Sequence, residues 1–344
     1  MPASCAIPDG LFPHLLGDAA EWRPTRLGGG ANNLVLLLEK NGKKHILKQY
    51  ARTTDRDRYA SEKIFYRWAA EEGLAQVPQA LGWDDPSQTA LFGFIEGRTA
   101  PDTAGLLETA QAAQFLLDLN HGRHRARRLP IPQAADTGDW ATQLQRVSAR
   151  VDKLRNLPPG IPLREELDAF LEEHLLPAWK RVSTRFQDTL SSNPDLALPL
   201  SADEEILSPS DFGFHNCRVG AGDQLSFFDF EYAGWDDPAK TAADFLRQPR
   251  HEVPLPLWAE FLKAVGELSP DPARFVRRTR ILAPLHNFKW CCIFLNEFLP
   301  GHLARRKTAT GKDPGTAEHL RTQISKARNH LETFESIPEE TWPT

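Results

Sequence analysis

The hydrophobic pattern of this 344-residue chain changes its period near Gly97, and that change constrains the fold more than any other feature. Before Gly97, short apolar runs separated by turn residues are typical of strands. After it, apolar residues recur at the three- and four-residue spacing of helices. The length suits two lobes better than one core. We therefore expect an α+β fold with an antiparallel-sheet N-terminal lobe, residues 1–96, and a mostly helical C-terminal lobe, residues 97–344.

A β-hairpin is predicted where the apolar runs 34–38 and 45–48 flank Asn41 and Gly42. Asn-Gly is a strong hairpin signal because both residues tolerate the positive φ angles of a type I′ turn. A short β-like interruption, 206–230, is expected within the helical lobe. The other expected elements are a helix over 54–70 opened by Thr54 or Asp55, a strand pair over 79–96, and helices over 103–120, 139–155, 165–186, 255–266, 271–298 and 316–334.

Composition and charge exclude several classes of protein. No apolar stretch is long enough to cross a bilayer, and the first ten residues lack a leader pattern, so we expect a cytoplasmic protein. A net charge of -5 gives no overall attraction to nucleic acid. The basic run 121–128 is interpreted as a solvated loop, with an anion site as the alternative. The four cysteines, expected as reduced thiols, lack the spacing of a metal or redox site; they are Cys5, Cys217, Cys291 and Cys292.

The segment 206–230 carries the clearest chemical signal. Asp211 precedes Asn216 by five positions, and Asp229 follows at the end of the next apolar strand. Phosphoryl transfer needs a carboxylate that orients the attacking hydroxyl, and an amide oxygen and a second carboxylate that hold magnesium on the phosphates. Asp and Asn are also common in turns, so the first pair alone would be a weak signal. The strand and the third residue strengthen it.

The N-terminal lobe offers a possible phosphate clamp. The glycine-rich segment 28–33 joins two predicted strands, and glycine lets backbone N–H groups approach phosphate oxygens. Lys48 ends the next strand on the same face as the apolar Ile46, which suits a phosphate contact. The alternatives are an ordinary flexible loop and a surface lysine.

Glu62 needs a cationic partner. It lies on the apolar face of the predicted helix 54–70, together with Tyr59, Phe65, Tyr66 and Ala69. An unpaired carboxylate on that face would be costly because it would lose its hydration without compensation. We favour Lys48 as the partner, with a surface pair to Arg58 as the alternative.

In this order, the features resemble the aminoglycoside phosphotransferase and choline kinase family, small-molecule kinases of protein-kinase-like fold. The resemblance runs from about Trp22 to Phe245 and includes a lobe connector at 92–97 and the segment 234–238 followed by Asp244. It implies ATP- and magnesium-dependent transfer of a phosphoryl group to a hydroxyl of a small metabolite. That metabolite would be a sugar, polyol, amino alcohol or amino sugar. GTP in place of ATP and the oligomeric state remain open.

The resemblance also implies a role for each matched residue. Asp211 would be the catalytic base, Asn216 and Asp229 the magnesium ligands, and Lys48 the contact to the α- and β-phosphates. The backbone near 92–96 would bind the adenine. The residues expected around the nucleotide are Gly28, Gly29, Gly30, Asn32, Asn33, Val35, Ile46, Lys48, Glu62, Phe92, Phe94, Glu96 and Phe228.

Two positions depart from the family pattern. The family usually has His-Gly before the catalytic Asp, whereas this chain has Pro209-Ser210. That histidine braces the catalytic loop, so either another residue takes its place, with His215 the nearest candidate, or the site is less active. Glu231 stands where an Asp-Phe-Gly motif would have glycine, and would assist at the metal or fix the loop.

The acceptor site is predicted in the helical lobe, where polar groups beside an aromatic wall could bind a small metabolite. A packing helix with incidental polar residues is the alternative. A cationic acceptor would use a tryptophan as a π surface, with Asp236 and Glu297 as counter-charges. The candidates are Trp235, Asp236, His286, Lys289, Trp290, Asn296 and Glu297.

Two other functions stay open. The departure at Pro209-Ser210 is compatible with a catalytically silent nucleotide-binding protein of kinase fold. A kinase for protein side chains is less favoured, because no activation segment of that type fits between Asp229 and Asp237.

Overall fold

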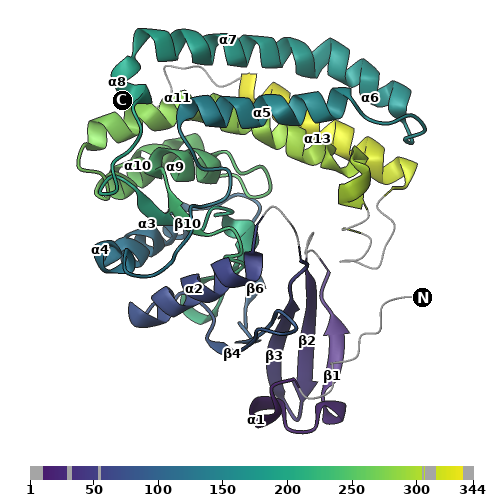
Figure 1. The fold of residues 1–344 in the computed structure, drawn as a ribbon, viewed down its shortest axis with the longest axis vertical. Coiled ribbons are helices and arrows are strands. Elements are labelled where there is room, and N and C mark those ends of the chain that lie inside the picture. The colour runs from purple at the N-terminus through teal and green to yellow at the C-terminus, as the bar shows by residue number, and fades with distance from the viewer. Residues whose placement is uncertain (1–10, 29–32, 53–55, 304–305, 307–314, 336–344) are drawn as a thin grey trace.

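A computed structural model describes residues 11–28, 33–52, 56–303, 306 and 315–335, and has the expected α+β architecture (Figure 1). A small lobe built around a sheet lies against a larger lobe in which long helices are layered. No helix in these ranges is both long and apolar enough to span a membrane. Cys217, Cys291 and Cys292 are buried, as expected, and Cys5 lies outside the described residues.

The N-terminal lobe contains a five-stranded antiparallel sheet in the order β1-β2-β3-β5-β4. Its strands are β1 (Arg23–Arg26), β2 (Leu34–Lys40), β3 (Lys43–Gln49), β4 (Ala80–Asp84) and β5 (Thr89–Gly93). The predicted hairpin is confirmed: Asn41 and Gly42 have φ angles of 50° and 78° between β2 and β3. Lys48 lies opposite Val35, and Ile46 lies opposite Phe92. Residues that face each other in an antiparallel pair share a face of the sheet, so these four side chains do so.

The helix after the sheet begins later than predicted. α2 (Arg58–Glu71) starts after Asp57, whose carboxylate accepts a hydrogen bond from the Ala60 amide at 2.9 Å. Thr54 and Asp55, the predicted caps, lie outside the described residues. The predicted face is confirmed, since Tyr59, Glu62, Phe65, Tyr66 and Ala69 are all buried.

The C-terminal lobe is mostly helical, and α11 packs against α5, α7, α9, α10 and α13. One predicted helix, 165–186, is three segments, because Pro177 has no N–H for the regular α-helical ladder and a π-helical stretch, Leu171–Leu175, precedes it. The main helices are α3 (Leu106–Asn120), α4 (Arg123–Ala126), α5 (Trp140–Arg155), α6 (Arg164–Phe170), α7 (Leu176–Ser192), α9 (Pro238–Leu246), α10 (Trp258–Gly266), α11 (Pro272–Phe294) and α13 (Ala317–Glu335). The shortest are α1 (Pro13–Leu16) and α8 (Pro194–Ala197).

Short strands hold the segment that carries the chemical signal. They are β6 (Arg98–Thr99), β7 (Ile206–Ser208), β8 (Cys217–Val219), β9 (Leu225–Phe227) and β10 (Gly234–Asp236). β7 pairs with β10, and β8 lies between β6 and β9. Asp211 therefore lies in the loop between β7 and β8, and Asp229 lies two residues after the end of β9. Stacked rings of Phe115, Phe212 and Phe227 pack beneath this segment.

The indole of Trp68 links α2 to the helical lobe. It is fully buried, and its Nε1 donates to the Leu119 carbonyl of α3 at 3.0 Å. Trp68→Ala should lower the free energy of unfolding by about 3–5 kcal/mol, because it leaves a cavity and an unpaired carbonyl. Urea denaturation would measure this. Leu107→Ala is the control, since Leu107 is 52% exposed, and should change stability by less than about 0.5 kcal/mol. Equal effects of the two changes would contradict this account of the packing.

Candidate functional site

A buried ion-pair network is centred on Lys48. Its Nζ lies 2.6 Å from Glu62 Oε2, 2.5 Å from Asp229 Oδ1 and 3.5 Å from Glu231 Oε2. The predicted pair of Lys48 with Glu62 is thus confirmed, whereas the guanidinium of Arg58 lies over the Tyr232 ring, 5.2 Å from its centroid. The network joins β3 and α2 to the segment after β9.

Glu62 is held by more than the lysine. Oε2 also accepts a hydrogen bond from the Tyr50 hydroxyl at 2.6 Å, and Oε1 accepts one from the Phe230 amide at 2.8 Å. These bonds satisfy a carboxylate that is only 1% exposed. Burial by itself lowers the pKa of Lys48, but Asp229, Glu62 and Glu231 outweigh it and raise that pKa well above its ordinary value. Lys48 is therefore a fixed cation at neutral pH.

The carboxylates around Lys48 could bind a divalent cation. Oxygen atoms of Glu62, Asp229 and Glu231 all lie within 4.8 Å of one another. Three carboxylates beside one ammonium leave two negative charges when all are ionised. Burial raises the pKa of Glu231 against the effect of Lys48, and the neighbouring carboxylates Asp229 and Glu62 raise it further. Carboxylate oxygens are ligands that magnesium prefers, so the residues fit such an ion.

Asn216 connects this network to Asp211. Its Nδ2 donates to the Asp211 carbonyl at 3.0 Å, and its backbone carbonyl accepts from the Phe228 amide at 3.0 Å. Because Nδ2 is the donor, the amide oxygen is left for a metal. Asp229 follows Phe228 with a φ of 68°, a left-handed conformation that Asp tolerates better than most residues. The chain turns at Asp229 and no longer follows the direction of the preceding strand.

His215 positions the Asp211 carboxylate. Gln248 Oε1 accepts from the amides of Arg250 at 2.7 Å and His251 at 3.1 Å, which makes Gln248 Nε2 the donor to His215 Nδ1 at 2.9 Å. His215 Nε2 then carries the proton and donates to Asp211 Oδ1 at 3.1 Å. Burial raises the pKa of Asp211, but His215 outweighs it and lowers the pKa below its ordinary value. Asp211 is therefore ionised at neutral pH.

Serine hydroxyls brace the loop at the position where the family has His-Gly. Ser210 has a φ of 68°, the region that glycine adopts most easily. Its amide donates to Ser208 Oγ at 3.0 Å, and Ser208 Oγ also accepts from the Thr241 hydroxyl at 2.8 Å. The Ser210 hydroxyl in turn donates to the Ala135 carbonyl at 3.3 Å. Short side chains on β7 and α9 thus hold the loop that bears Asp211.

The residues predicted around the nucleotide differ in solvent exposure and in their contacts. Gly29, Gly30 and Asn32 lie outside the described residues, and Gly28 is exposed. Asn33 is buried, with its Nδ2 donating to Glu231 Oε2 and its Oδ1 accepting from the Ala51 amide. Its side chain therefore fixes Glu231. The remaining predicted side chains are half-buried or buried, except for the exposed Glu96; they are Val35, Ile46, Phe92, Phe94 and Phe228.

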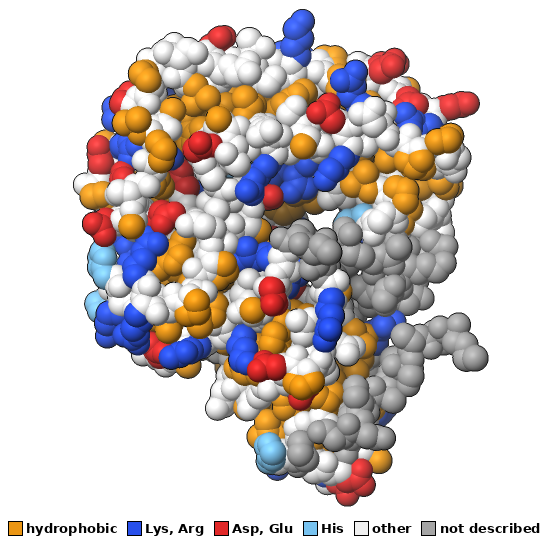
Figure 2. Space-filling view, in the orientation of Figure 1, with side chains coloured by type: hydrophobic (Ala, Val, Ile, Leu, Met, Phe, Trp, Pro, Cys, Tyr) orange, Lys and Arg blue, Asp and Glu red, His pale blue; other side chains and the backbone are white. Residues whose placement is uncertain are grey.

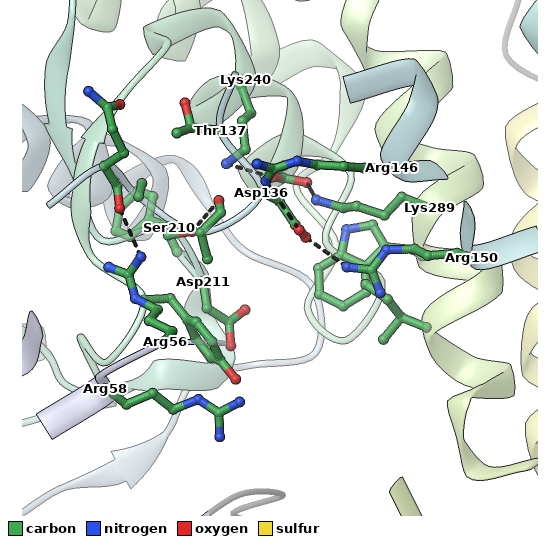
Figure 3. Close-up of a pocket in the computed structure, with 18 of the residues that line it drawn as sticks. Arg56, Arg58, Asp136, Thr137, Arg146, Arg150, Ser210, Asp211, Lys240 and Lys289 are labelled. Atoms are coloured by element: carbon green, nitrogen blue, oxygen red, sulfur yellow. Dashed lines mark hydrogen bonds and ion pairs between the residues drawn. The ribbon is translucent and has the colours of Figure 1, made fainter. Parts of the chain in front are cut away.

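A cavity of about 660 Å³ adjoins Asp211 on the side of the helical lobe (Figure 3). Three of the predicted acceptor residues line it: Lys289, Trp290 and Asn296. Most of its other polar side chains were missed by the sequence analysis. They are Arg56, Arg58, Asp136, Arg146, Arg150, Lys240 and Asp244. Two signals were present: Arg146 and Arg150 are one helical turn apart, as are Lys240 and Asp244.

Four predicted acceptor residues do not line this cavity. Trp235 is buried beneath the guanidinium of Arg127, which lies 3.4 Å from the ring centroid. His286 contacts Asp244 and Gln143 at 3.0 and 2.8 Å. Asp236 is buried against Lys240 at 2.8 Å, and Glu297 against Arg306 at 2.8 Å.

Hydrophobic periodicity could not show which side chains of α11 reach the cavity. Several helices surround α11, so its polar side chains are buried as well as its apolar ones. The basic run 121–128 does not contribute to this cavity either. Its arginines contact acidic side chains and backbone carbonyls on the surface, including Glu71 and Glu72, and none of them lines the cavity.

Comparisons with known proteins identify the fold and the family. No curated protein has a matching sequence. A choline kinase from Streptococcus pneumoniae has a similar structure, with a TM-score of 0.57, 15% identity and coverage of 93% of this chain and 97% of that one. A spectinomycin phosphotransferase bound to ADP and spectinomycin has a TM-score of 0.60 at 10% identity, covering 93% of each chain. An ethanolamine kinase from Plasmodium vivax has a TM-score of 0.56 at 13% identity, covering 94% and 85%.

At these identities the structural similarity shows a shared fold, and the sequence itself carries the family assignment. Residues 24–278 match the model of a phosphotransferase enzyme family. Because this match spans most of the chain, the protein belongs to that family and is a small-molecule kinase with a two-lobed, protein-kinase-like fold.

Proposed function

We propose that the chain transfers the γ-phosphoryl group of ATP, with magnesium, to a hydroxyl group of a small metabolite. The observation that carries this proposal is the continuous link between Lys48 and Asp211. Lys48 contacts Asp229, Phe228 binds Asn216, and Asn216 binds Asp211. This link brings together a phosphate-binding cation, metal-binding oxygens and a carboxylate for the acceptor, which are the groups that phosphoryl transfer requires.

In this proposal the nucleotide lies between residues 1–96 and 97–344. Two structures of similar fold, both spectinomycin phosphotransferases, hold ADP or AMP. Val35, Ile46 and Phe92 share the sheet face with Lys48, so an adenine stacked on them would direct its phosphates toward the ammonium. The backbone at 94–96 is in no regular strand, which leaves its peptide groups for the base. GTP would fit the same arrangement.

Asp211 acts on the acceptor hydroxyl. His215 holds one carboxylate oxygen, and the other can accept a hydrogen bond from the hydroxyl. Since the pKa of Asp211 is lowered, this carboxylate orients the nucleophile and receives its proton late, as a loose transition state permits. Asn216 and Asp229 would hold magnesium, with Glu231 behind them. Bound magnesium would neutralise charge that develops on the phosphate oxygens.

Two features support activity over a silent nucleotide-binding protein. Ser208 and Ser210 brace the loop without the usual histidine, and His215 orients the catalytic carboxylate. A kinase for protein side chains is less well supported, because β10 begins five residues after Asp229 and leaves no long activation segment.

Asp211→Asn should lower kcat about 10²- to 10⁴-fold, because the amide cannot accept the hydroxyl proton. The affinity for ATP should change little. Mass spectrometry of phosphate adducts on a metabolite panel and a calorimetric ATP titration would measure both. Asp223→Asn, at an exposed carboxylate, is the control and should retain full activity. Tight ATP binding by the wild type with no turnover on the panel would instead indicate a silent protein.

Lys48→Met should abolish transfer and lower the free energy of unfolding by about 3–5 kcal/mol, because Glu62 would remain buried without its cation. The double change Lys48→Met with Glu62→Gln should recover most of the stability and none of the activity. Urea denaturation and transfer assays would check these results. Lys43→Met, at an exposed position of the same strand, should alter neither. Loss of stability that persists in the double variant would contradict the assigned role of the ion pair.

A further inference from the structure

We propose that the acceptor is an anion, a small hydroxylated compound that also carries a phosphate or carboxylate group. This inference rests on the proposed kinase function and specifies its substrate class. The cavity beside Asp211 is lined by three carboxylates, Asp136, Asp211 and Asp244. It is also lined by six cationic side chains: Arg56, Arg58, Arg146, Arg150, Lys240 and Lys289. The lining therefore has three more cations than anions.

The lysines at one wall of the cavity are compensated locally. Lys289 lies 2.6 Å from Asp244 Oδ1, and Lys240 lies 3.5 Å from Asp244 Oδ2. Lys240 also contacts the buried Asp236 at 2.8 Å. Counting Asp236, two lysines face two carboxylates here, so this wall is close to neutral. The excess positive charge lies with the arginines and is greatest at Arg146 and Arg150, because Arg56 and Arg58 also interact with Glu231, which is not a lining residue.

Arg146 and Arg150 form one source of that excess. They are one turn apart on α5, and Figure 3 shows both directed toward Asp136. Arg150 contacts it at 2.8 Å and Arg146 at 3.7 Å. Burial raises the pKa of Asp136, but Arg150 outweighs it and lowers that pKa, so Asp136 is ionised. Two guanidiniums thus share one negative charge. Each guanidinium has five N–H donors, so several remain for a ligand.

Arg56 and Arg58 approach from the N-terminal lobe. Arg56 donates to the carbonyls of Gln133 and Ala233, both at 2.8 Å, which fixes its guanidinium at the cavity edge. Arg58 lies over Tyr232, another lining residue. In Figure 2, Lys and Arg side chains gather beside a hollow in the middle of the face shown. An acceptor in the cavity would therefore meet cations from both lobes.

An anionic acceptor fits this cavity better than an aminated one. Asp236 and Glu297, the counter-charges expected for a cationic acceptor, are buried in ion pairs of their own. Of the lining carboxylates, Asp211 serves the reacting hydroxyl, and the other two are already in contact with cations. Trp290 and Ile293 add an apolar wall, and about 660 Å³ is enough room for a small metabolite.

A charge-sorted panel would test this inference. Wild-type protein with ATP and magnesium would be incubated with phosphorylated, carboxylated, neutral and aminated hydroxyl compounds, including glucose 6-phosphate, gluconate, glucose and glucosamine. We expect transfer to the phosphorylated or carboxylated class, and the two arms separate these sources of charge. The KM of the accepted anion should rise with ionic strength because exposed charges are screened.

Arg150→Gln should raise the KM of that anion about 10- to 100-fold, the value of a charged hydrogen bond, and leave the KM for ATP within about twofold. Arg150→Lys should recover part of the loss because it keeps the charge. Lys153→Gln, on the same helix but outside the cavity, is the matched control. Thermal melting of each variant would show that it is folded.

Each of the other possible outcomes would contradict a specific part of the proposal. Asp211-dependent transfer to neutral or aminated compounds, at least as efficient as to anions, would refute the anionic acceptor and leave the kinase intact. An equal rise in the KM for ATP in Arg150→Gln would assign the cavity to the nucleotide and refute it as well. No transfer to any class would refute the kinase, and the acceptor assignment with it.

Discussion

The buried contact between Lys48 and Glu62 is the interaction on which the rest of the site depends. A charged pair excluded from water is stable only when its geometry is good and its remaining hydrogen-bonding groups are satisfied. Here Tyr50 and the Phe230 amide complete the shell of Glu62, and Asp229 completes that of Lys48. The strand, the helix and the segment after β9 must all be in place for this. The environment of Lys48 therefore depends on the small lobe and on the segment after β9 together.

The surroundings of Asp211 have opposite charge on its two sides. Carboxylates outnumber cations around Lys48, which suits a divalent ion, while cations outnumber carboxylates in the cavity beyond Asp211. Asp211 lies between them: it lines the cavity, and its backbone carbonyl accepts a hydrogen bond from Asn216. Such a division separates the tasks of the site: the acidic side can hold a metal-bound nucleotide, and the basic side can hold an acceptor. The carboxylates around Lys48 also disfavour an anionic acceptor on their own side, because like charges repel at these short distances.

The loop around Asp211 shows how a family pattern can change while its geometry persists. Pro209 replaces a histidine, but Ser208 Oγ accepts hydrogen bonds from the Ser210 amide and the Thr241 hydroxyl, and the Ser210 hydroxyl donates to the Ala135 carbonyl, which fixes the backbone. The orientation of the carboxylate passes to His215, whose tautomer is set by Gln248. Activity in such a site depends on where the oxygen atoms are held, and several side chains can hold them equally well.

The sequence by itself determined the order and type of most elements, because helix and strand periods are local properties of the chain. It also favoured the Lys48–Glu62 pair over a pair with Arg58, since a carboxylate on an apolar face requires a cation and the strand lysine could supply one; the structure confirms that choice. The start of α2 was missed because Asp57 caps it. Only the tertiary structure decided the cavity beside Asp211, whose lining comes from both lobes and from helices far apart in sequence. Periodicity identifies a buried face but not the element that covers it, so His286 and Glu297 were assigned to the acceptor although packing places them elsewhere.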